Sequence, residues 1–363
     1  MNIALTGGGT GGHIFPALSV LDALRLRAVK RDSVVFFGPE NRGERDLVER
    51  HGVEFEAVPS AAIRGRGPMA LAKSIVRLGW GTLVAARKLR SFHADVVFST
   101  GGYASFPCCL AARLLRKPVV VYLPDVSPGW AVRAEKRLAT RMATTTEAAL
   151  EHLPRDRTIV TGYPVRSAFF GQSKGQARAA LGIAPDARLL LIAGASQGAQ
   201  SINAAVFKGI RTLLNDTTVY HITGAADYDE ARGFESQLGS ELARRYHPAP
   251  FREDLPTLML AADLAVLRAG ASTLGELPAA GLPAILVPAA YAGGHQKHNA
   301  AWLVDSGAAV VVDEKALGTL CEGAVDLIQD AVRLASMREA ALRLSRPDAA
   351  MEIADLVREV GKR

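Results

Sequence analysis

The sequence predicts an α/β protein with two Rossmann-like parallel-sheet domains that face each other across a cleft. Short apolar, β-branched runs alternate with longer segments of helical spacing along most of the chain. The runs are continuously apolar, which is typical of parallel strands covered by helices on both faces. The unit of strand, glycine-rich turn and helix occurs twice, and 363 residues are about twice the usual size of one domain.

The predicted strands divide equally between the two halves of the chain. In the first half they span residues 2–5, 33–37, 54–58, 95–98 and 118–122. In the second half they span residues 188–192, 218–223, 264–267, 284–287 and 309–312. Helical spacing is clearest in residues 18–29, 69–90, 199–213 and 273–280.

The domain boundary is expected near Thr161-Gly162-Tyr163-Pro164, where glycine and proline interrupt the pattern. We therefore expect a first domain over residues 1–163 and a second over residues 164–345. The last segment, residues 346–363, is expected to form a helix that packs back on the first domain. Parallel sheets bind ligands at the carboxyl ends of their strands, so functional residues are expected in the strand-to-helix loops.

Composition and charge exclude several classes of protein. The formal net charge is +7, with 23 basic and 14 acidic side chains among the first 164 residues against 20 and 22 in the remainder. Nothing in this distribution indicates nucleic-acid binding. The three cysteines form no CxxC pair, which argues against a zinc site or a disulfide framework. The amino terminus has no signal-peptide pattern and no apolar stretch reaches the roughly 18 residues that span a bilayer, so we expect a soluble cytoplasmic protein.

The first glycine-rich loop, residues 7–12, is followed at once by His13. Its glycines let a ligand approach the backbone, and the N-terminus of the following helix favours an anion. A GxGxxG pattern is present, but a nicotinamide site needs an acidic residue at the end of the second strand, and Glu40 lies beyond a Gly-Pro break. His13 can accept a proton from a substrate hydroxyl; the alternative is a helix-capping or solvated histidine.

Three further loops combine small and polar residues at strand ends. Residues 99–107 carry glycines and hydroxyls that suit a sugar ligand or an ordinary tight turn. Residues 268–276 place hydroxyls at a helix start, which suits a diphosphate, and Glu276 can accept two ribose hydroxyls; a capping motif is the alternative. Residues 291–299 are interpreted as a polar binding loop, because their two histidines lack a carboxylate or cysteine at metal-ligand spacing.

Two isolated features carry less weight. Asp227-Tyr228-Asp229 matches the DxD pattern by which one class of sugar transferases holds a metal-bound nucleotide, but one short match among 36 acidic residues is weak support. Arg166 follows the domain boundary, where it suits a phosphate, although a solvated or salt-bridged arginine is the default interpretation.

Taken together, the motifs resemble those of one family. In chain order they are GGGTGGHIFPAL, RGRG, GGYASFP, TGYPVR, GASQGA, RAGASTLGELPAAGLPAILVP and HQKHNA. Their order and spacing over residues 1–312 are similar to those of the MurG-type N-acetylglucosaminyltransferases of peptidoglycan synthesis, which have the GT-B fold. The resemblance implies an inverting enzyme that needs no metal or other cofactor. It would transfer N-acetylglucosamine from UDP-N-acetylglucosamine to the C4 hydroxyl of the N-acetylmuramyl unit of lipid I, giving lipid II.

The resemblance also implies roles by position, with the lipid-linked muramyl acceptor on the first domain and the UDP-sugar donor on the second. The implied acceptor-side residues are Thr10, Gly11, Gly12, His13 and Tyr103, of which His13 is the candidate base. The implied donor-side residues are Arg166, Ser196 and Gln197 for the uridine and phosphates, Phe251 and Arg252 for the uracil, Ala271, Ser272 and Thr273 for the diphosphate, Glu276 for the ribose, and Gln296 and Asn299 for the sugar. Thr10, Gly11 and Gly12 are also expected within reach of the donor.

The chain departs from the family pattern at three places. Tyr122-Leu123-Pro124-Asp125 stands where the family has His-Glu-Gln-Asn, Tyr163 replaces an asparagine, and Arg252 replaces an apolar residue. The first change bears on the acceptor more than on the donor. Asp125 can hydrogen-bond a sugar or assist as a base, and it can equally repel a lipid diphosphate. We therefore carry Asp125 as a second candidate catalytic and acceptor-binding residue.

A basic segment predicts membrane contact. Residues 61–94 contain no acidic residue. Their basic residues are Arg64, Arg66, Lys73, Arg77, Arg87, Lys88 and Arg90, and the interleaved apolar residues are Ile75, Val76, Leu78, Trp80, Leu83 and Val84. Such a helix favours docking on an anionic bilayer, and a domain helix with one core face is the alternative. With a lipid-linked substrate, we expect a peripheral protein at the cytoplasmic face of the cell membrane.

Three other functions stay open. The chain can be a GT-B glycosyltransferase that acts on a different lipid or glycan acceptor, as the change at residues 122–125 suggests. It can be a UDP-sugar epimerase of the same fold, which needs no acceptor. It can also be a non-enzymatic nucleotide-sugar-binding subunit, whose function would survive the loss of His13.

Overall fold

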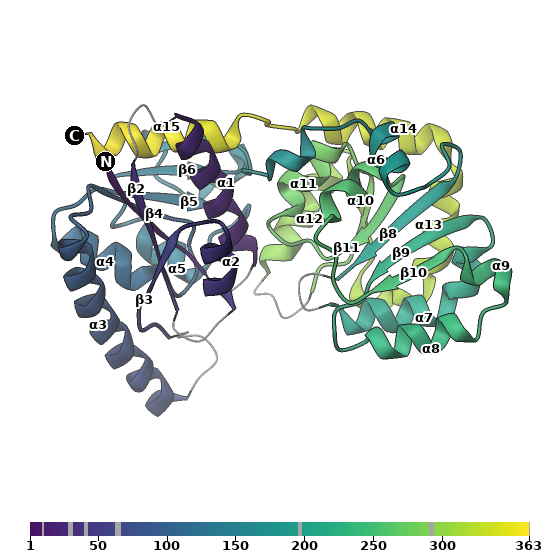
Figure 1. Cartoon of the computed structure of the whole chain (residues 1–363), viewed down its shortest axis with the longest axis horizontal. Coiled ribbons are helices and arrows are strands. Elements are labelled where there is room, and N and C mark those ends of the chain that lie inside the picture. The colour runs from purple at the N-terminus through teal and green to yellow at the C-terminus, as the bar shows by residue number, and fades with distance from the viewer. Residues whose placement is uncertain are drawn as a thin grey trace. The chain divides into compact units, whose positions relative to one another are not determined.

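The chain forms two compact units, of which the first comprises Met1–Arg166 together with Pro347–Arg363 and the second Ser167–Arg346 (Figure 1). The computed structural model describes residues 1–8, 11–27, 32–39, 43–61, 67–194, 198–289 and 294–362. The end of the chain therefore returns to the first unit after the second unit is complete.

Within the described residues, the first unit is built around a seven-stranded sheet with the order β3-β2-β1-β4-β5-β6-β7, in which all pairs are parallel. Its strands are β1 (Asn2–Thr6), β2 (Ser33–Gly38), β3 (Glu54–Ala57), β4 (Val96–Ser99), β5 (Val119–Leu123), β6 (Arg141–Thr144) and β7 (Thr158–Val160). All residues of β4 and β5 are buried, because helices cover both faces of the sheet, and this explains their uninterrupted apolar runs.

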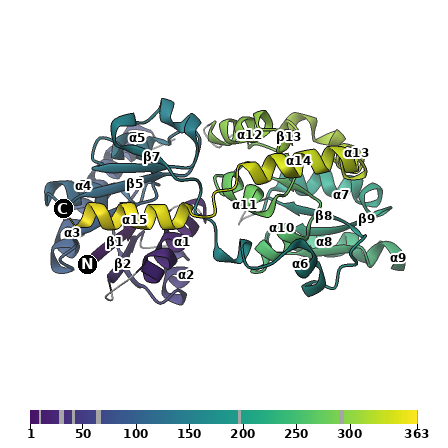
Figure 2. The same ribbon diagram turned by 90° about the horizontal axis from the view of Figure 1, so that it is seen from above.

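Helices lie on both faces of this sheet. They are α1 (Gly11–Arg27), α2 (Glu44–Arg50), α3 (Pro68–Ser91), α4 (Phe106–Leu114), α5 (Trp130–Glu135) and α15 (Ala349–Gly361), with short 3-10 turns η1 (Glu147–Glu151) and η2 (Arg155–Arg157). α1 and α15 lie next to each other on one face of the sheet (Figure 2). Ile3 points to this face, where it shares a core with Ile353. Ala4 points to the opposite face, where it packs in a second core with Leu89 of α3 and Cys108 of α4.

The second unit contains, in its described part, a six-stranded parallel sheet with the order β10-β9-β8-β11-β12-β13. Its strands are β8 (Arg188–Ala193), β9 (Thr217–Ile222), β10 (Tyr246–Ala249), β11 (Leu264–Leu267), β12 (Ala284–Leu286) and β13 (Ala309–Val311). Its helices are η3 (Ser167–Phe169), α6 (Lys174–Ala180), α7 (Gln200–Leu214), α8 (Tyr228–Ser236), α9 (Ser240–Ala243), α10 (Leu255–Ala261), α11 (Thr273–Ala280), α12 (His295–Asp305), η4 (Glu314–Thr319), α13 (Leu320–Gln329) and α14 (Ala331–Arg343). Ile202 of α7 and Leu327 of α13 pack with Ile192 and Val266 in its core.

The predicted fold class is confirmed, but the pattern of the sequence does not predict β6, β7 or β10. β7 and β10 are edge strands with intermediate exposure, and β10 contains Pro248, which an edge strand tolerates. Short strands that are not fully buried lack the long apolar run by which the others are found. The first helix also begins at Gly11 rather than at residue 18, although Pro16 lies inside it.

Candidate functional site

The strand order of each unit brings two motif loops to neighbouring strand ends. In the first unit β1 lies between β2 and β4, so the loop that follows β1 and the loop that follows β4 leave the sheet side by side. In the second unit β8 lies between β9 and β11 and has the same relation to its neighbours. Parallel sheets bind ligands at such switch points. The glycine-rich motifs therefore lie where each unit is best able to hold a ligand.

The two loops of the first unit approach each other at glycines. A Cβ atom on Gly102 would lie 2.1 Å from the carbonyl oxygen of Gly8, and one on Gly7 would lie 2.2 Å from Oγ1 of Thr100. Gly102 also has a φ of +92°, a backbone conformation that glycine adopts without strain. Packing and backbone conformation both require glycine at residue 102.

His13 lies in the first turn of α1 and is joined to the loop after β4 by two hydrogen bonds. Its Nδ1 atom lies 2.8 Å from the carbonyl oxygen of Thr100, and Oγ1 of Thr100 donates to the carbonyl oxygen of His13 at 2.6 Å. Because a carbonyl oxygen only accepts, Nδ1 carries the proton. In the neutral ring Nε2 is then an acceptor, which is the state that a general base requires.

A buried carboxyl group contacts the same loop from the core side. Oγ of Ser99 donates to Oε2 of Glu135 at 2.9 Å, and Oγ of Ser105 lies 2.5 Å from Oε1. Glu135 is fully buried, and burial raises its pKa to about 7, although the hydroxyls of Ser105 and Ser99 lower it. No motif of the sequence identifies Glu135 as part of the site.

The other acceptor-side residues predicted from the sequence follow strands of the same sheet. Gly11 and Gly12 are the first residues of α1. Tyr103 is half-buried between β4 and α4, and Asp125 is half-buried just after β5. Thr10 lies outside the described residues. His13, Tyr103 and Asp125 thus follow β1, β4 and β5, three neighbouring strands of one sheet.

Tyr122 and Tyr163, two of the residues that differ from the family pattern, contact each other in the core. Tyr122 is fully buried, and its hydroxyl forms hydrogen bonds with Oγ1 of Thr145 at 2.6 Å and with the carbonyl oxygen of Gly162 at 3.2 Å. Its ring meets that of Tyr163 edge-on, with centroids 6.5 Å apart. Burial raises the pKa of Tyr122 well above its usual value, so the phenol is neutral. Tyr122 fills the interior of the unit.

In the second unit, the loop after β11 turns tightly into α11. Oγ1 of Thr273 donates to the carbonyl oxygen of Gly270 at 2.6 Å. The N–H of Glu276 donates to the carbonyl oxygen of Ser272 at 2.8 Å. Ala271 lies inside this turn, and Glu276 is half-buried in the first turn of the helix. The N-terminus of an eight-residue helix, which attracts negative charge, therefore begins at the predicted diphosphate loop.

Two polar residues of α12 support neighbouring loops of the same unit. Asn299 is fully buried, and its Nδ2 atom donates to the carbonyl oxygen of Ala269 at 3.1 Å. Oε1 of Gln296 accepts from the N–H of Ala289 at 2.8 Å. Asn299 thus holds the chain one residue before the turn into α11.

The predicted uracil-contacting pair follows β10. Phe251 is 61% exposed, whereas Arg252 is engaged with its neighbours. The guanidinium group of Arg252 donates from Nε and Nη2 to both carboxylate oxygens of Asp254, at 2.7 and 2.5 Å. It also lies 5.7 Å from the ring centroid of Tyr220. Its side chain is therefore held by an ion pair.

Three residues were expected at the uridine and phosphates of the donor. Arg166 ends the first stretch of the first unit, and its guanidinium group lies 5.1 Å from the ring centroid of Phe15 on α1, in cation–π range. Ser196 and Gln197 lie outside the described residues.

The DxD triplet has a structural explanation. Oδ2 of Asp227 accepts a hydrogen bond at 2.6 Å from Nδ2 of Asn203, which also donates to the carbonyl oxygen of Thr223 at 2.8 Å. Asn203 thereby joins α7 both to the end of β9 and to Asp227 at the start of α8. In the part of the chain that the structure describes, no three histidine, cysteine or acidic side chains gather as metal ligands do.

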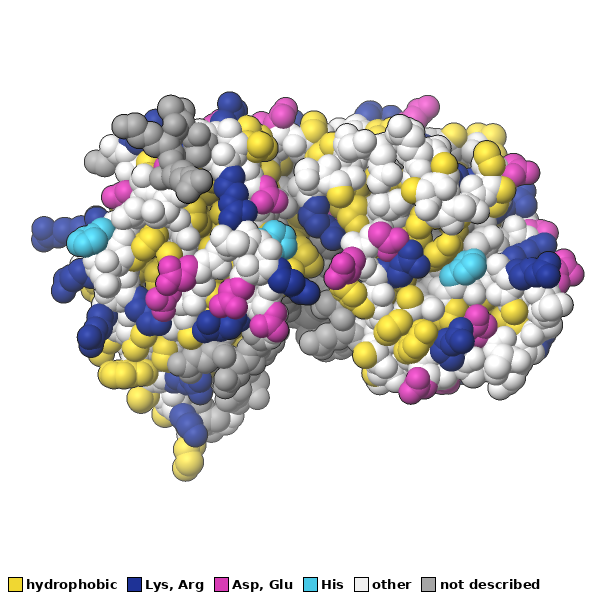
Figure 3. Space-filling view, in the orientation of Figure 1, with side chains coloured by type: hydrophobic (Ala, Val, Ile, Leu, Met, Phe, Trp, Pro, Cys, Tyr) yellow, Lys and Arg dark blue, Asp and Glu magenta, His cyan; other side chains and the backbone are white. Residues whose placement is uncertain are grey.

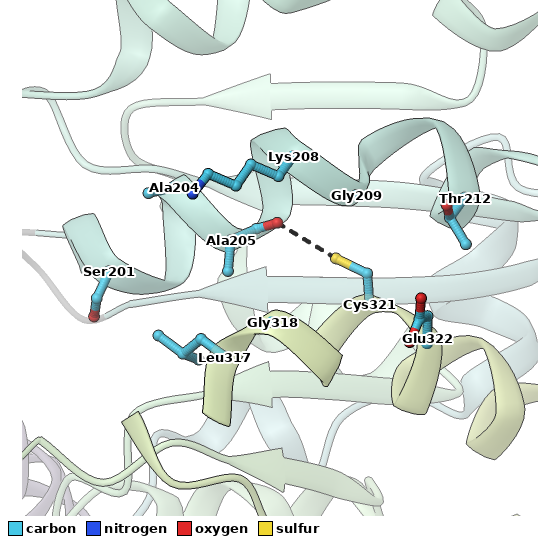
Figure 4. Close-up of a pocket in the computed structure, with 10 residues that line it drawn as sticks. All are labelled: Ser201, Ala204, Ala205, Lys208, Gly209, Thr212, Leu317, Gly318, Cys321 and Glu322. Atoms are coloured by element: carbon cyan, nitrogen blue, oxygen red, sulfur yellow. Dashed lines mark hydrogen bonds between the residues drawn. The ribbon is translucent and has the colours of Figure 1, made fainter. Parts of the chain in front are cut away.

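A pocket of about 340 Å³ lies elsewhere in the second unit, between α7 and the segment of η4 and α13 (Figure 4). Ser201, Lys208 and Cys321 line it, and none of the predicted site residues does. Oγ of Ser201 accepts from Arg268, the first residue of the predicted diphosphate loop, which also pairs with Glu314 at 2.6 Å. The pocket is therefore separate from the motif loops, although one buried arginine connects the two.

Comparison with known proteins identifies the family of the chain. The N-terminal domain model of glycosyltransferase family 28 matches residues 3–144, and the C-terminal domain model of the same family matches residues 189–353. A Roseiflexus sp. protein named UDP-N-acetylglucosamine–N-acetylmuramyl-(pentapeptide) pyrophosphoryl-undecaprenol N-acetylglucosamine transferase is 37% identical, over 97% of this chain and 93% of its own. A protein of the same name from Desulforudis audaxviator is also 37% identical, over 99% of this chain and 98% of its own.

Solved structures show the same fold. The crystal structure of MurG from Acinetobacter baumannii matches with a TM-score of 0.76 and 24% identity, over 99% of each chain. A UDP-N-acetylglucosamine 2-epimerase from Neisseria meningitidis, bound to UDP-N-acetylglucosamine, matches with a TM-score of 0.69 and 16% identity, over 99% of this chain and 100% of its own. The resemblance predicted from the motifs is confirmed. The chain belongs to glycosyltransferase family 28, among the N-acetylglucosamine transferases named for the UDP-N-acetylglucosamine donor and the N-acetylmuramyl-(pentapeptide) pyrophosphoryl-undecaprenol acceptor.

Proposed function

We propose that this enzyme transfers N-acetylglucosamine from UDP-N-acetylglucosamine to the C4 hydroxyl of the N-acetylmuramyl unit of lipid I, giving lipid II with inversion at the sugar carbon. The observation that carries the proposal is the pairing of motif loops at the switch point of each sheet, in a chain 37% identical to transferases of that name. The first unit would bind the acceptor and the second the donor.

On the acceptor side, His13 is the proposed general base. Its Nδ1–H is committed to the carbonyl oxygen of Thr100, so Nε2 is the atom that would take the proton of the attacking hydroxyl. Asp125 is the second candidate, because it follows β5, two strands from β1 in the same sheet. The oxygen that loses its proton attacks the anomeric carbon as the bond to UDP breaks, and no covalent enzyme intermediate is formed.

On the donor side, the N-terminus of α11 would stabilise the departing diphosphate. The backbone N–H groups of this helix terminus and its dipole favour the negative charge that develops as UDP leaves. Glu276, half-buried one turn into α11, would accept the ribose hydroxyls. In this proposal His13 or Asp125 would act as the base, and the N-terminus of α11 would bind the diphosphate of the leaving UDP.

The decisive experiment is a transfer assay with the purified protein, radiolabelled UDP-N-acetylglucosamine and a lipid I analogue. We expect a labelled lipid-linked disaccharide to form. Transfer to a different lipid or glycan, without transfer to the muramyl acceptor, would show that lipid I is not the acceptor of this enzyme. The likeness to a UDP-N-acetylglucosamine 2-epimerase is tested in the same reaction without acceptor, in which an epimerase would still convert the donor.

Replacement of Glu276 by glutamine should raise the KM for UDP-N-acetylglucosamine about tenfold and change kcat much less. A hydrogen bond to a charged group contributes about 1.5–3 kcal/mol, and the amide keeps only part of it. Steady-state kinetics at saturating acceptor measure both constants. Glu339→Gln, an exposed position on α14, is the matched control and should behave as wild type. An unchanged donor KM in Glu276→Gln would remove this residue from the donor site.

Membrane contact is proposed for the outer face of α3, where hydrophobic and basic side chains lie together (Figure 3). Met69, Val76, Trp80 and Leu83 recur at helical spacing and are 87, 72, 60 and 64% exposed, and the exposed Lys73 and Arg87 continue the same stripe.

The opposite face of α3 belongs to the core, so the apolar residues of this segment divide into two groups. Leu78, one of the apolar residues that the sequence pattern assigns to membrane contact, is 6% exposed. Lys88 does not belong to the proposed membrane face either, since it pairs with Glu56 and donates to the carbonyl oxygen of Ala57. Arg64 and Arg66 lie outside the described residues. No helix in the described part of the chain is both long and apolar enough to cross a membrane, and the proposed contact is peripheral, at the cytoplasmic face.

The double variant Trp80→Ser/Leu83→Ser should bind vesicles that contain anionic lipid at least about tenfold more weakly than wild type. Burial of each large apolar side chain contributes about 1.5–3 kcal/mol, so loss of two exceeds the roughly 1.4 kcal/mol of a tenfold change even with partial insertion. Vesicle sedimentation measures the partition constant. Val332→Ser, which removes a side chain that is 83% exposed on α14, should bind as wild type does. Equal binding of the double variant and wild type would contradict the membrane face.

A further inference from the structure

Glu135 has no role in the chemistry above, yet it is the centre of the polar contacts behind the loop after β4. It is fully buried on α5, and two serines that flank the Gly101-Gly102 turn contact its two oxygens. A buried carboxyl group among neutral partners is costly to keep unless it is uncharged or fully hydrogen-bonded. Both oxygens of Glu135 meet neutral hydroxyls, those of Ser99 and Ser105.

Counting hydrogens around this group favours the protonated acid. Oγ of Ser105 has one proton and lies near two oxygens, Oε1 of Glu135 at 2.5 Å and the carbonyl oxygen of Gly102 at 2.7 Å. If Oε1 carries a proton, Glu135 donates to Ser105 and Ser105 donates to Gly102. Oγ of Ser99 accepts from the N–H of Gly101 at 3.0 Å and donates to Oε2. Each of these contacts then has one donor and one acceptor.

The same loop holds His13. Between the two serines lies Thr100, whose carbonyl oxygen accepts the Nδ1–H of His13 and whose hydroxyl donates back to the His13 carbonyl. Val132, one turn before Glu135 on α5, supports the turn as well, since a Cβ atom on Gly101 would lie 2.8 Å from its Cγ2. A chain of contacts thus runs from the carboxyl group through the loop to the imidazole ring.

We propose that Glu135, as a protonated acid, is a positioning residue for the acceptor side: it holds the loop of residues 99–105 in the form that orients His13 and selects its Nδ1-protonated tautomer. The proposal rests on the proposed function only for its effect on transfer. Its structural part, the tautomer of His13, stands without it.

The groups that face the carboxyl group agree with a neutral site. From α4 the ionisable neighbours are the thiols of Cys108 and Cys109, and burial raises the pKa of Cys108 to about 12 and that of Cys109 well above its usual value. Both thiols are therefore uncharged at neutral pH. Burial also raises the pKa of Glu135 itself, to about 7, so its carboxyl group is protonated below that pH and ionises as the pH rises through it.

The variants Glu135→Gln and Glu135→Leu distinguish the hydrogen bonds of this side chain from the space that it fills. The amide of glutamine can donate to Ser105 and accept from Ser99, as the protonated acid does, so Glu135→Gln should keep kcat within about threefold of wild type. Leucine leaves both hydroxyls without this partner, and Glu135→Leu should lower kcat at least about tenfold while the KM for UDP-N-acetylglucosamine stays within about twofold. Misplacement of a catalytic group by about 1 Å can cost roughly 10²-fold.

The tautomer of His13 gives a readout independent of turnover. In spectra of ¹⁵N-histidine-labelled protein, with His13 assigned from its loss in His13→Gln, wild type and Glu135→Gln should show Nδ1 protonated, and Glu135→Leu a mixture of tautomers. Ser99→Ala/Ser105→Ala should behave as Glu135→Leu does, and it decides the question if the leucine variant does not fold. An unchanged tautomer and kcat in these variants would overturn the proposal. So would a glutamine variant as impaired as the leucine one.

The two proposals fail separately. A wild type that transfers nothing to the muramyl acceptor, but whose His13 tautomer responds to Glu135→Leu, would overturn the proposed function and leave the positioning role intact. A wild type that transfers normally, with a tautomer that does not respond, would overturn only the role of Glu135.

The pH dependence of stability gives a further check. The carboxyl group has a pKa near 4.5 in an unfolded chain and about 7 in the folded protein, so the folded state holds its proton more tightly. Its contribution to stability is fully present below about pH 4.5 and is lost as the pH rises through about 7. The Tm of wild type should therefore fall over this range relative to that of Glu135→Gln. Parallel Tm curves for the two proteins would contradict a protonated Glu135.

Discussion

Replacement of His13 by alanine should lower kcat for transfer by about 10²- to 10⁴-fold, which is the usual contribution of a general base. The Nε2 atom that would take the proton is lost, whereas the helix terminus that would hold UDP lies in the other unit. The KM for UDP-N-acetylglucosamine should therefore change by less than about twofold. Steady-state kinetics with a lipid I analogue, together with calorimetric titration of UDP, measure the two effects.

Two variants make this result specific. His152→Ala removes an exposed histidine of the same unit and should leave kcat unchanged. Asp125→Asn tests the second candidate base. If Asp125→Asn lowers kcat by more than His13→Ala does, the base is Asp125 and His13 has another role.

Replacement of Gly102 by alanine should lower transfer about 100-fold, although no catalytic atom is removed. The new Cβ would lie 2.1 Å from the carbonyl oxygen of Gly8 and would sit on a backbone with a φ of +92°. The atom that it meets belongs to the backbone, so the loop must move, and Thr100, which holds the ring of His13, moves with it. A displacement of about 1 Å at a catalytic group is enough for an effect of this size.

Gly79→Ala is the matched control. Gly79 lies on the exposed side of α3, where a Cβ atom would meet no other atom within 4 Å, and alanine is favoured over glycine in a helix. This variant should keep its activity and its Tm should not fall. Binding of UDP should be retained in both glycine variants, because the second unit is untouched. Normal transfer by Gly102→Ala would show that the contact between the two loops is not needed for catalysis.

Much of the fold follows from local pattern. The buried strands β1, β4 and β5 are short apolar runs, and each is followed by glycine or proline near a helix start, so residues adjacent in the chain are enough to identify them. β7 and β10 cannot be found in this way because edge strands need no continuous apolar run. The helical stripe of α3 is visible as spacing, but which of its faces meets the core depends on what packs against it.

The departures at Tyr122 and Tyr163 illustrate the limit of motif comparison. In the sequence they are two separate changes at positions where the family has polar residues. In the structure they are one change, since the two rings pack together and the hydroxyl of Tyr122 bonds to Thr145 and Gly162. Because the two tyrosines are far apart in the sequence, motif comparison does not predict that they contact each other.

The sequence by itself determined the fold class and the family, and it predicts which loops carry the chemistry, because strand, turn and helix signals and glycine-rich motifs involve residues next to each other in the chain. Only the tertiary structure decided which groups support those loops. Glu135 meets Ser99 and Ser105 across 36 and 30 residues, and His13 meets Thr100 across 87. Such contacts form when the parallel strands align their carboxyl ends, and no local pattern records them.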